Sequence, residues 1–133
     1  MTIDDWEVTL NSFDFRNRVS DGRWYFTPQD GNTFLYASFT VENLGNVPRV
    51  FNPRVARRND IVTSISYGDV MFAEISLAGY DAALLGRTIS PLVSSTGSIV
   101  YTVAERVAQS DEPLTLVLFS ESQAQFRQFN VRP

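Results

Sequence analysis

The alternation of apolar and polar residues constrains the fold of this chain more than any other feature of its sequence. In the clearest segment, Thr33 to Glu42, every second residue is apolar: Leu35, Ala37, Phe39 and Val41. A repeat of two places these side chains on one face of a β-strand, whereas a helix would need apolar residues three or four positions apart. The segment is therefore predicted to be a strand with one buried face, and its alternate residues to lie on a half-exposed face.

The same repeat recurs along the chain and predicts seven to eight short strands. Besides 33–42, strands are expected at 6–10, 24–26, 61–67, 69–77, 98–103, 114–118 and 126–131, and the only candidate helix is 78–87. Two packed antiparallel sheets bury one face of every strand. We therefore predict an all-β, immunoglobulin-like antiparallel β-sandwich of seven to eight strands. Six inward residues should form its core: Leu35, Phe39, Ile99, Tyr101, Leu116 and Leu118. Without linkers or repeats, residues 1–133 are expected to form one domain.

Missing residue types exclude several classes of protein. The chain has no Cys and no His, and all 11 of its basic residues are Arg. These absences exclude a disulfide framework, a zinc–cysteine site, a thiol or histidine-based enzyme and a lysine Schiff base. The net charge of -4 argues against general nucleic-acid binding. No apolar run approaches the roughly 20 residues of a membrane span, and no signal peptide is visible at the start of the chain.

Carboxylates are the remaining groups for catalysis or metal binding, and their spacing selects no site. Glycoside hydrolysis needs two carboxyl groups about 5 to 9.5 Å apart, and no pair stands out. Asp14, Asp21, Asp30 and Asn32 offer oxygen ligands for Ca²⁺, although Asp30-Gly31 is also an ordinary hairpin turn. We therefore expect no enzymatic activity, no cofactor and no metal.

Two motifs resemble a known family. The strand 33–42 runs into Asn43-Leu-Gly45 with Pro48 soon after, and Pro91 and Gly97 precede a second alternating strand. This pattern resembles the DUF4352, or telokin-like, bacterial immunoglobulin-like domains, which are similar to the secreted antigen MPT63. The resemblance covers about residues 5 to 131, although the turn between Pro91 and Gly97 is longer than the family's. It implies an exported or lipid-anchored extracytoplasmic domain without established enzymatic activity.

The turn after Glu42 carries a local prediction of its own. Asn tolerates a positive φ and can bond its own backbone, and Gly adopts a positive φ without steric cost. Asn43 or Gly45 is therefore expected to have a positive φ.

An arginine-bearing segment is the first candidate interaction site. Arginine is enriched in protein interfaces, and four arginines fall within ten residues of one loop-like stretch: Arg49, Arg54, Arg57 and Arg58. Such a loop could equally be a solvated surface. The first functional hypothesis is thus a non-enzymatic extracytoplasmic module that binds an unknown protein partner.

An aromatic cluster supports the alternative hypothesis, a carbohydrate-binding module. Four rings could form a flat platform for a sugar if the strand at 24–26 pairs with 33–42: Trp24, Tyr25, Phe34 and Tyr36. The competing interpretation is that Trp24 and Phe34 complete the core, because buried rings supply the largest apolar contacts.

Overall fold

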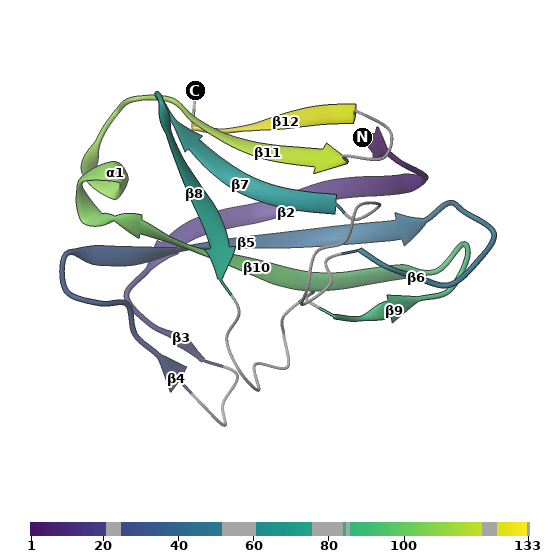
Figure 1. The fold of residues 1–133 in the computed structure, drawn as a ribbon. Coiled ribbons are helices and arrows are strands. Elements are labelled where there is room, and N and C mark those ends of the chain that lie inside the picture. Colours follow the sequence, from purple (N-terminus) through teal and green to yellow (C-terminus); the bar gives the residue numbers. More distant parts are fainter. Residues whose placement is uncertain (21–24, 52–60, 76–83, 85, 121–124, 133) are drawn as a thin grey trace.

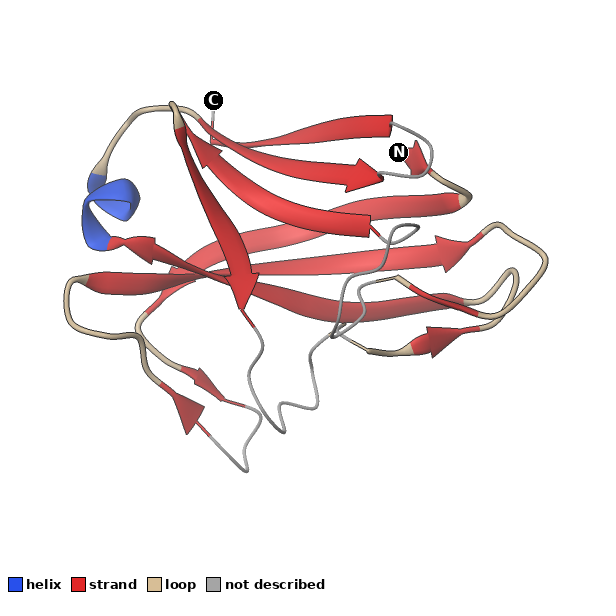
Figure 2. Cartoon of the chain, in the orientation of Figure 1, coloured by secondary structure: helices blue, strands red, loops and turns tan. Residues whose placement is uncertain are grey.

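The computed structural model describes residues 1–20, 25–51, 61–75, 84, 86–120 and 125–132. Strands dominate these residues and one short helix interrupts them (Figure 2). In chain order the elements are β1 (Thr2–Ile3), β2 (Trp6–Arg16), β3 (Val19–Ser20), β4 (Tyr25–Phe26), β5 (Asn32–Asn43), β6 (Arg49–Val50), β7 (Ile61–Tyr67), β8 (Val70–Ile75), β9 (Thr88–Ile89), β10 (Ser94–Ala104), α1 (Glu105–Gln109), β11 (Leu114–Ser120) and β12 (Gln125–Arg132).

Eight strands form one continuous hydrogen-bonded β-sheet, which is the main series of strands, in the order β1-β2-β5-β10-β8-β7-β11-β12. Every strand pairing in it is antiparallel. Figure 1 shows the series folded into two layers, with β2, β5 and β10 in one and β7, β11 and β12 in the other. The predicted all-β sandwich is confirmed. The seven strands longer than two residues coincide with seven of the predicted segments, and the eighth, 24–26, overlaps β4. The other two-residue strands hold too few residues for alternation to show.

Strand β8 crosses from one layer to the other (Figure 1). It pairs with β7 from Val70 to Ala73, and its last two residues, Glu74 and Ile75, pair with β10. The two layers are therefore joined by backbone hydrogen bonds at this corner as well as by side-chain packing.

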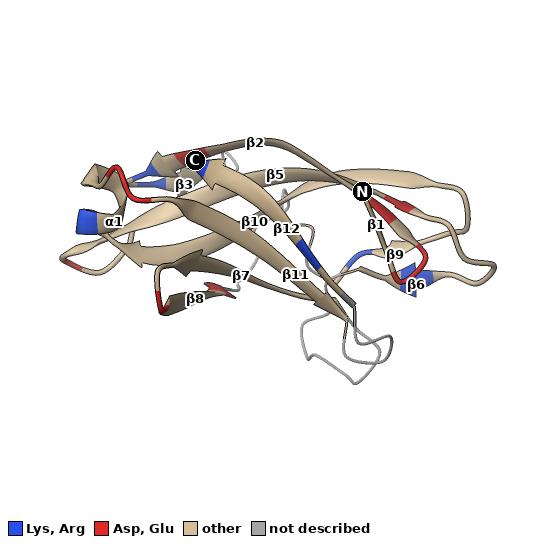
Figure 3. Ribbon diagram, turned by 90° about the horizontal axis from the view of Figure 1, so that it is seen from above, with Lys and Arg blue, Asp and Glu red and all other residues tan. Residues whose placement is uncertain are grey.

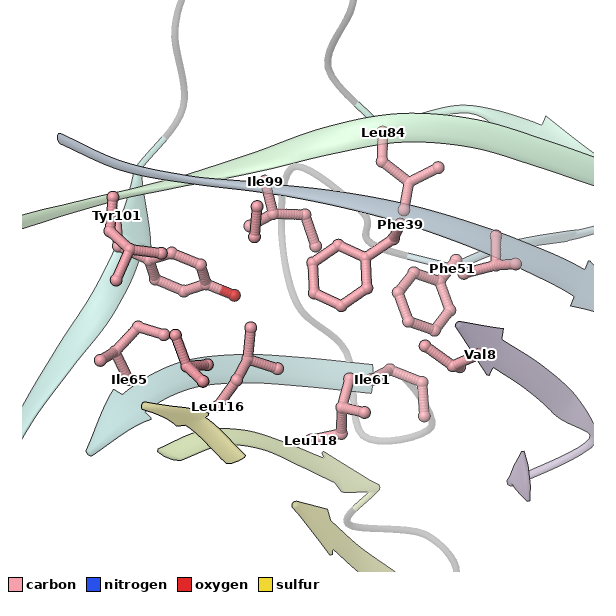
Figure 4. Packing of buried hydrophobic residues seen from close by; sticks show 14 of the residues in the cluster. Val8, Phe39, Phe51, Ile61, Ile65, Leu84, Ile99, Tyr101, Leu116 and Leu118 are labelled. Atoms are coloured by element: carbon pink, nitrogen blue, oxygen red, sulfur yellow. The ribbon is translucent and has the colours of Figure 1, made fainter. Parts of the chain in front are cut away.

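Side chains from both layers form one apolar core (Figure 4). All six residues predicted to be inward are at most 3% exposed, which confirms the strand parity. At one end of the core the rings of Trp6 and Phe51 meet edge to face, with centroids 5.2 Å apart. Such aromatic pairs add about 0.5 to 1.5 kcal/mol beyond the area that they bury.

The sequence analysis missed α1, the one helix within the described residues. Residues 78–87 lie mostly outside the described residues, whereas α1 follows β10 directly and buries Val107. Glu, Arg, Ala and Gln are good helix formers, but five residues are too few for a helical repeat to stand out from the strand that precedes them.

The prediction of a positive φ at Asn43 or Gly45 is wrong. The described residues with positive φ near this turn include Leu92, at 62°, but neither of those two. The chain reverses through the Asn43 side chain instead, because its Oδ1 accepts a hydrogen bond of 2.9 Å from the Gly45 backbone N–H. Glycine at position 45 also avoids a close approach, since a Cβ there would lie 3.2 Å from that same Oδ1.

Asn43 also joins three segments of the chain. Its fully buried Nδ2 donates to the backbone oxygen of Val47 at 2.8 Å and to that of Ile89 at 2.9 Å. Its backbone oxygen accepts from the Leu92 N–H at 2.7 Å. The motif residue therefore holds the end of β5 to the segments around β6 and β9.

Candidate binding surfaces

Arg49 is the only member of the predicted arginine site within the described residues, and it contacts other parts of the domain. Its Nη1 donates to the Asp4 backbone oxygen at 2.9 Å, and its Nη2 donates to the Asp4 carboxylate at 3.2 Å. The guanidinium also lies 5.2 Å from the centre of the Trp6 ring. These contacts give Arg49 a structural role between β6 and the turn after β1. The other three lie outside the described residues, so the site stays a prediction: Arg54, Arg57 and Arg58.

The predicted aromatic platform has a different arrangement from the one expected. β4 pairs with β3 and not with β5, so the assumed pairing is wrong. Trp24 lies outside the described residues, Tyr25 is 68% exposed and Phe34 is 3% exposed. Phe34 is buried on the outer face of β5, where it forms a small second core with Val19 and Val100. The hairpin of β3 and β4 thus covers part of a face that alternation alone marks as exposed.

Tyr25 and Phe34 nevertheless line a shallow pocket beside this hairpin, which we call the ring pocket. Its volume is about 520 Å³. Its walls combine three aromatic rings and one proline ring with hydroxyl and amide groups: Tyr25, Phe26, Thr27, Pro28, Gln29, Asn32, Phe34 and Thr102. That volume lies in the range of small-molecule sites. None of the lining side chains carries a formal charge.

Two arginine–tyrosine stacks flank the ring pocket. The Arg18 guanidinium lies 5.5 Å from the centre of the Tyr25 ring, and that of Arg16 lies 3.8 Å from the centre of Tyr36. Arg16 also donates to both carboxylate oxygens of Asp14, at 2.9 and 3.1 Å. Tyr36, the remaining platform residue, therefore has one ring face occupied by Arg16 and is not a free stacking surface.

A second surface, which the sequence analysis missed, lies on the outside of the other layer. The register between β7, β8, β11 and β12 places eleven described side chains on this outer face, opposite the core: Val62, Ser64, Ser66, Met71, Ala73, Thr115, Val117, Phe119, Phe126, Gln128 and Asn130. None of the eleven is charged. We call this surface the neutral face, and Figure 3 shows its central strands, β7 and β11, free of charged residues.

An apolar row crosses the neutral face. Phe119 pairs with Val62 on one side and with Phe126 on the other, so the three side chains are neighbours on adjacent strands. They are 41%, 43% and 51% exposed, respectively. The signal was present in the sequence, because each of these residues is apolar at a position whose parity points away from the core.

The described residues offer no clear centre for metal or acid–base chemistry. No group of three or more Asp, Glu, His or Cys within them is placed to hold a metal ion. Of the residues weighed as calcium ligands, Asp14 binds Arg16, and Asp21 lies outside the described residues.

One carboxylate, Glu74, belongs to a partly buried network. Tyr101 donates its hydroxyl proton to Thr63 Oγ1 at 2.7 Å, and Thr63 donates to the Glu74 carboxylate. Burial raises the pKa of Tyr101 above its ordinary value. The negative charge of Glu74 raises this pKa further, whereas the hydrogen bond to Thr63 lowers it. A tyrosine whose neutral form is favoured in this way serves as a hydrogen-bond donor in the core.

Comparisons with known proteins place the chain among uncharacterised domains. A family model described as "Domain of unknown function (DUF4352)" matches residues 1–124. No curated protein matches the chain. Within the described residues, no helix has the length and apolar character needed to cross a membrane.

Three solved structures are similar to this one. An uncharacterised β-sandwich protein of Clostridium difficile is 15% identical with a TM-score of 0.68, and covers 99% of this chain and 89% of its own. A conserved hypothetical protein of Bacillus anthracis is 13% identical with a TM-score of 0.69, over 98% and 90% of the two chains. A "putative lipoprotein" of Bacillus subtilis is 18% identical with a TM-score of 0.64, over 97% of this chain and 37% of that one. At these identities the likeness concerns the fold.

Proposed function

The chain belongs to DUF4352, a family of domains of unknown function, and from that premise we propose that it is a non-enzymatic interaction module of an extracytoplasmic bacterial protein. In this proposal the module binds a protein partner through the neutral face. The extracytoplasmic setting is supported by the family resemblance and by the fold shared with the "putative lipoprotein". A secreted protein or one held by a lipid anchor would present the domain in the same way.

The observation that carries the proposal is the exposed row of Val62, Phe119 and Phe126. Single exposed apolar side chains are normal on protein surfaces. A contiguous apolar group supports a docking role, because large exposed apolar patches occur at sites that another surface covers. Aromatic residues are enriched and charged residues depleted in the centre of protein interfaces, and the neutral face has both properties.

Site-specific cross-linking in the source bacterium tests this proposal. A photoreactive phenylalanine analogue at position 119 is expected to give a discrete adduct with a protein. The same analogue at Thr9, an exposed residue on the opposite layer, is the matched control. The adduct should disappear when Phe126→Ser is added. Equal labelling from positions 119 and 9 would refute the proposal.

The ring pocket favours a second candidate function, carbohydrate binding. Tyr25 offers a ring that is 68% exposed, with the Arg18 guanidinium 5.5 Å from its centre, and Gln29, Asn32 and Thr102 offer both donors and acceptors of hydrogen bonds around it. A sugar presents an apolar ring face edged by hydroxyl groups, so a ring surrounded by amide and hydroxyl side chains complements it. The uncharged lining fits a neutral sugar.

Titration with neutral oligosaccharides tests the second candidate. Cello- and chito-oligosaccharides should shift the side-chain amide resonances of Gln29 and Asn32 in a saturable way. Tyr25→Ala should abolish the shifts, whereas Phe126→Ala, which removes an exposed ring from the other layer, should leave them unchanged. Saturable shifts that survive Tyr25→Ala would place binding elsewhere, and no shifts with either series would remove this candidate.

A further inference from the structure

We propose that the neutral face binds a second copy of this chain, giving a reversible dimer with two-fold symmetry. The inference rests on the proposed function and specifies its partner. In a two-fold dimer the same patch serves both subunits and must therefore be complementary to itself. An uncharged surface with a central apolar row meets this requirement, because it brings no like charges together.

The net charge of the chain favours this face over the others for self-association. Each copy carries a net charge of -4, so two copies repel one another on average. None of the eleven outer residues listed for the neutral face carries a charge. Contact through the neutral face therefore opposes no like charges among these residues, whereas contact through the outer side of the opposite layer would also involve Glu7 and Glu42, which face one another across β2 and β5.

The register of the strands defines how the two faces would meet. Sheets pack face to face at about 10 Å, with their strands about 30° apart. A two-fold axis beside Phe119 places this ring in each copy near Phe126 of the other copy. The two rings are already neighbours within one copy, so the dimer would contain a cluster of four phenylalanines at its centre.

Pairing through strand edges is a less favourable route to a dimer. β12 ends the main series of strands, and an exposed edge strand can pair with another chain. However, the β12 side chain of Arg127 donates from Nε to the Thr2 backbone oxygen of β1 at 3.0 Å. Because β1 lies against β12, part of this edge is covered within the domain, and face-to-face packing is the better option.

The area of the neutral face determines how tightly two copies are expected to bind one another. Four strands about 4.8 Å apart and six residues long, at about 3.4 Å per residue, span a footprint of about 400 Å² on each copy. The total of about 800 Å² lies below the roughly 1,200 Å² of stable complexes. We therefore expect a weak dimer with a dissociation constant on the order of 100 μM.

Sedimentation velocity between about 5 μM and 1 mM tests the inference. The wild-type chain should shift from monomer to dimer over this range, and added salt should strengthen the dimer because it screens the repulsion between the copies. Phe119→Asp should remain monomeric throughout, with an unchanged melting temperature as the check on its fold. Thr9→Asp adds the same charge to the opposite layer and should dimerise like the wild type.

A charge-complementation experiment tests the register. Phe119→Asp and Phe126→Lys should each be monomeric alone, but their mixture should form a heterodimer because the new charges would face one another. A wild-type chain that stays monomeric at 1 mM, or a Thr9→Asp variant as impaired as Phe119→Asp, would overturn the inference. If the chain is monomeric but position 119 still cross-links to a different protein, the proposed function survives and only the identity of the partner is wrong.

Discussion

Replacing Asn43 with alanine should be among the most destabilising single changes outside the apolar core. The side chain makes three hydrogen bonds, of 2.8, 2.9 and 2.9 Å, to backbone groups of Val47, Ile89 and Gly45. Alanine makes none of them. It also leaves a cavity where the buried amide stood.

The magnitude follows from the burial of each bond. The bond to Ile89 is fully buried, and a buried carbonyl left without a partner costs about 1 to 3 kcal/mol. The bonds to Val47 and Gly45 are partly buried, and each contributes about 1 kcal/mol. Asn43→Ala should therefore lower the free energy of unfolding by about 3 to 5 kcal/mol, which is a large share of the 5 to 15 kcal/mol typical of a domain.

Urea denaturation followed by tryptophan fluorescence measures the loss. The midpoint should fall while the m value stays constant, because the surface exposed on unfolding hardly changes. Asn11→Ala is the matched control: its Nδ2 donates to Thr40 Oγ1 at an exposed site, and its loss should cost less than about 0.5 kcal/mol. If Asn43→Ala costs under 1 kcal/mol, the idea that this side chain holds three segments together is wrong.

Three further predictions concern the core and the first turn. Phe39→Ala should lower the free energy of unfolding by about 3 to 5 kcal/mol in the same urea assay, and a loss under 1 kcal/mol would contradict its place in the core. Because the folded pKa of Tyr101 is raised, its contribution to stability is complete below the unfolded value of about 10 and falls above it, by about 1.4 kcal/mol per pH unit. Thermal melts from pH 8 to 11 should show this loss of stability with rising pH in the wild type and a smaller loss in Tyr101→Phe. Equal losses in the two proteins would refute the role assigned to Tyr101. Arg49→Ala removes one of the partners of the Asp4 carboxylate, which is only 9% exposed and also accepts from Ser120 Oγ at 3.2 Å. The change should cost about 1 to 3 kcal/mol, whereas a double variant with Asp4→Asn should recover part of the loss.

Strand parity was the part of the fold that the sequence predicted well. Leu35 and Phe39 point inward because a repeat of two leaves a strand only two ways to face, and a shift of one residue would expose both. The same rule placed Tyr101 and Leu116 in the core. Such predictions depend on neighbours within one strand and need no knowledge of how the strands are arranged.

Features that depend on distant segments were missed. Phe34 has outward parity, yet the hairpin of β3 and β4 buries it against Val19, and nothing within β5 indicates that cover. The Asn43 turn depends on Ile89, 46 residues away along the chain. Strand parity marks Phe119 and Phe126 individually as outward apolar residues, but they become neighbours only through the register of β11 with β12, so the continuous row cannot be recognised from any one strand.

Strand β8 has a consequence for how the molecule opens. Because it hydrogen-bonds to β7 along most of its length and to β10 at its end, neither layer can separate without breaking a ladder that the other shares. If only side-chain packing held the two layers together, the layers could separate and unfold independently. Each layer would then have its own free energy of opening. Here the slowest-exchanging amides of β10 and β7 should report a single opening event, so native-state hydrogen exchange would find one cooperative unit spanning both layers.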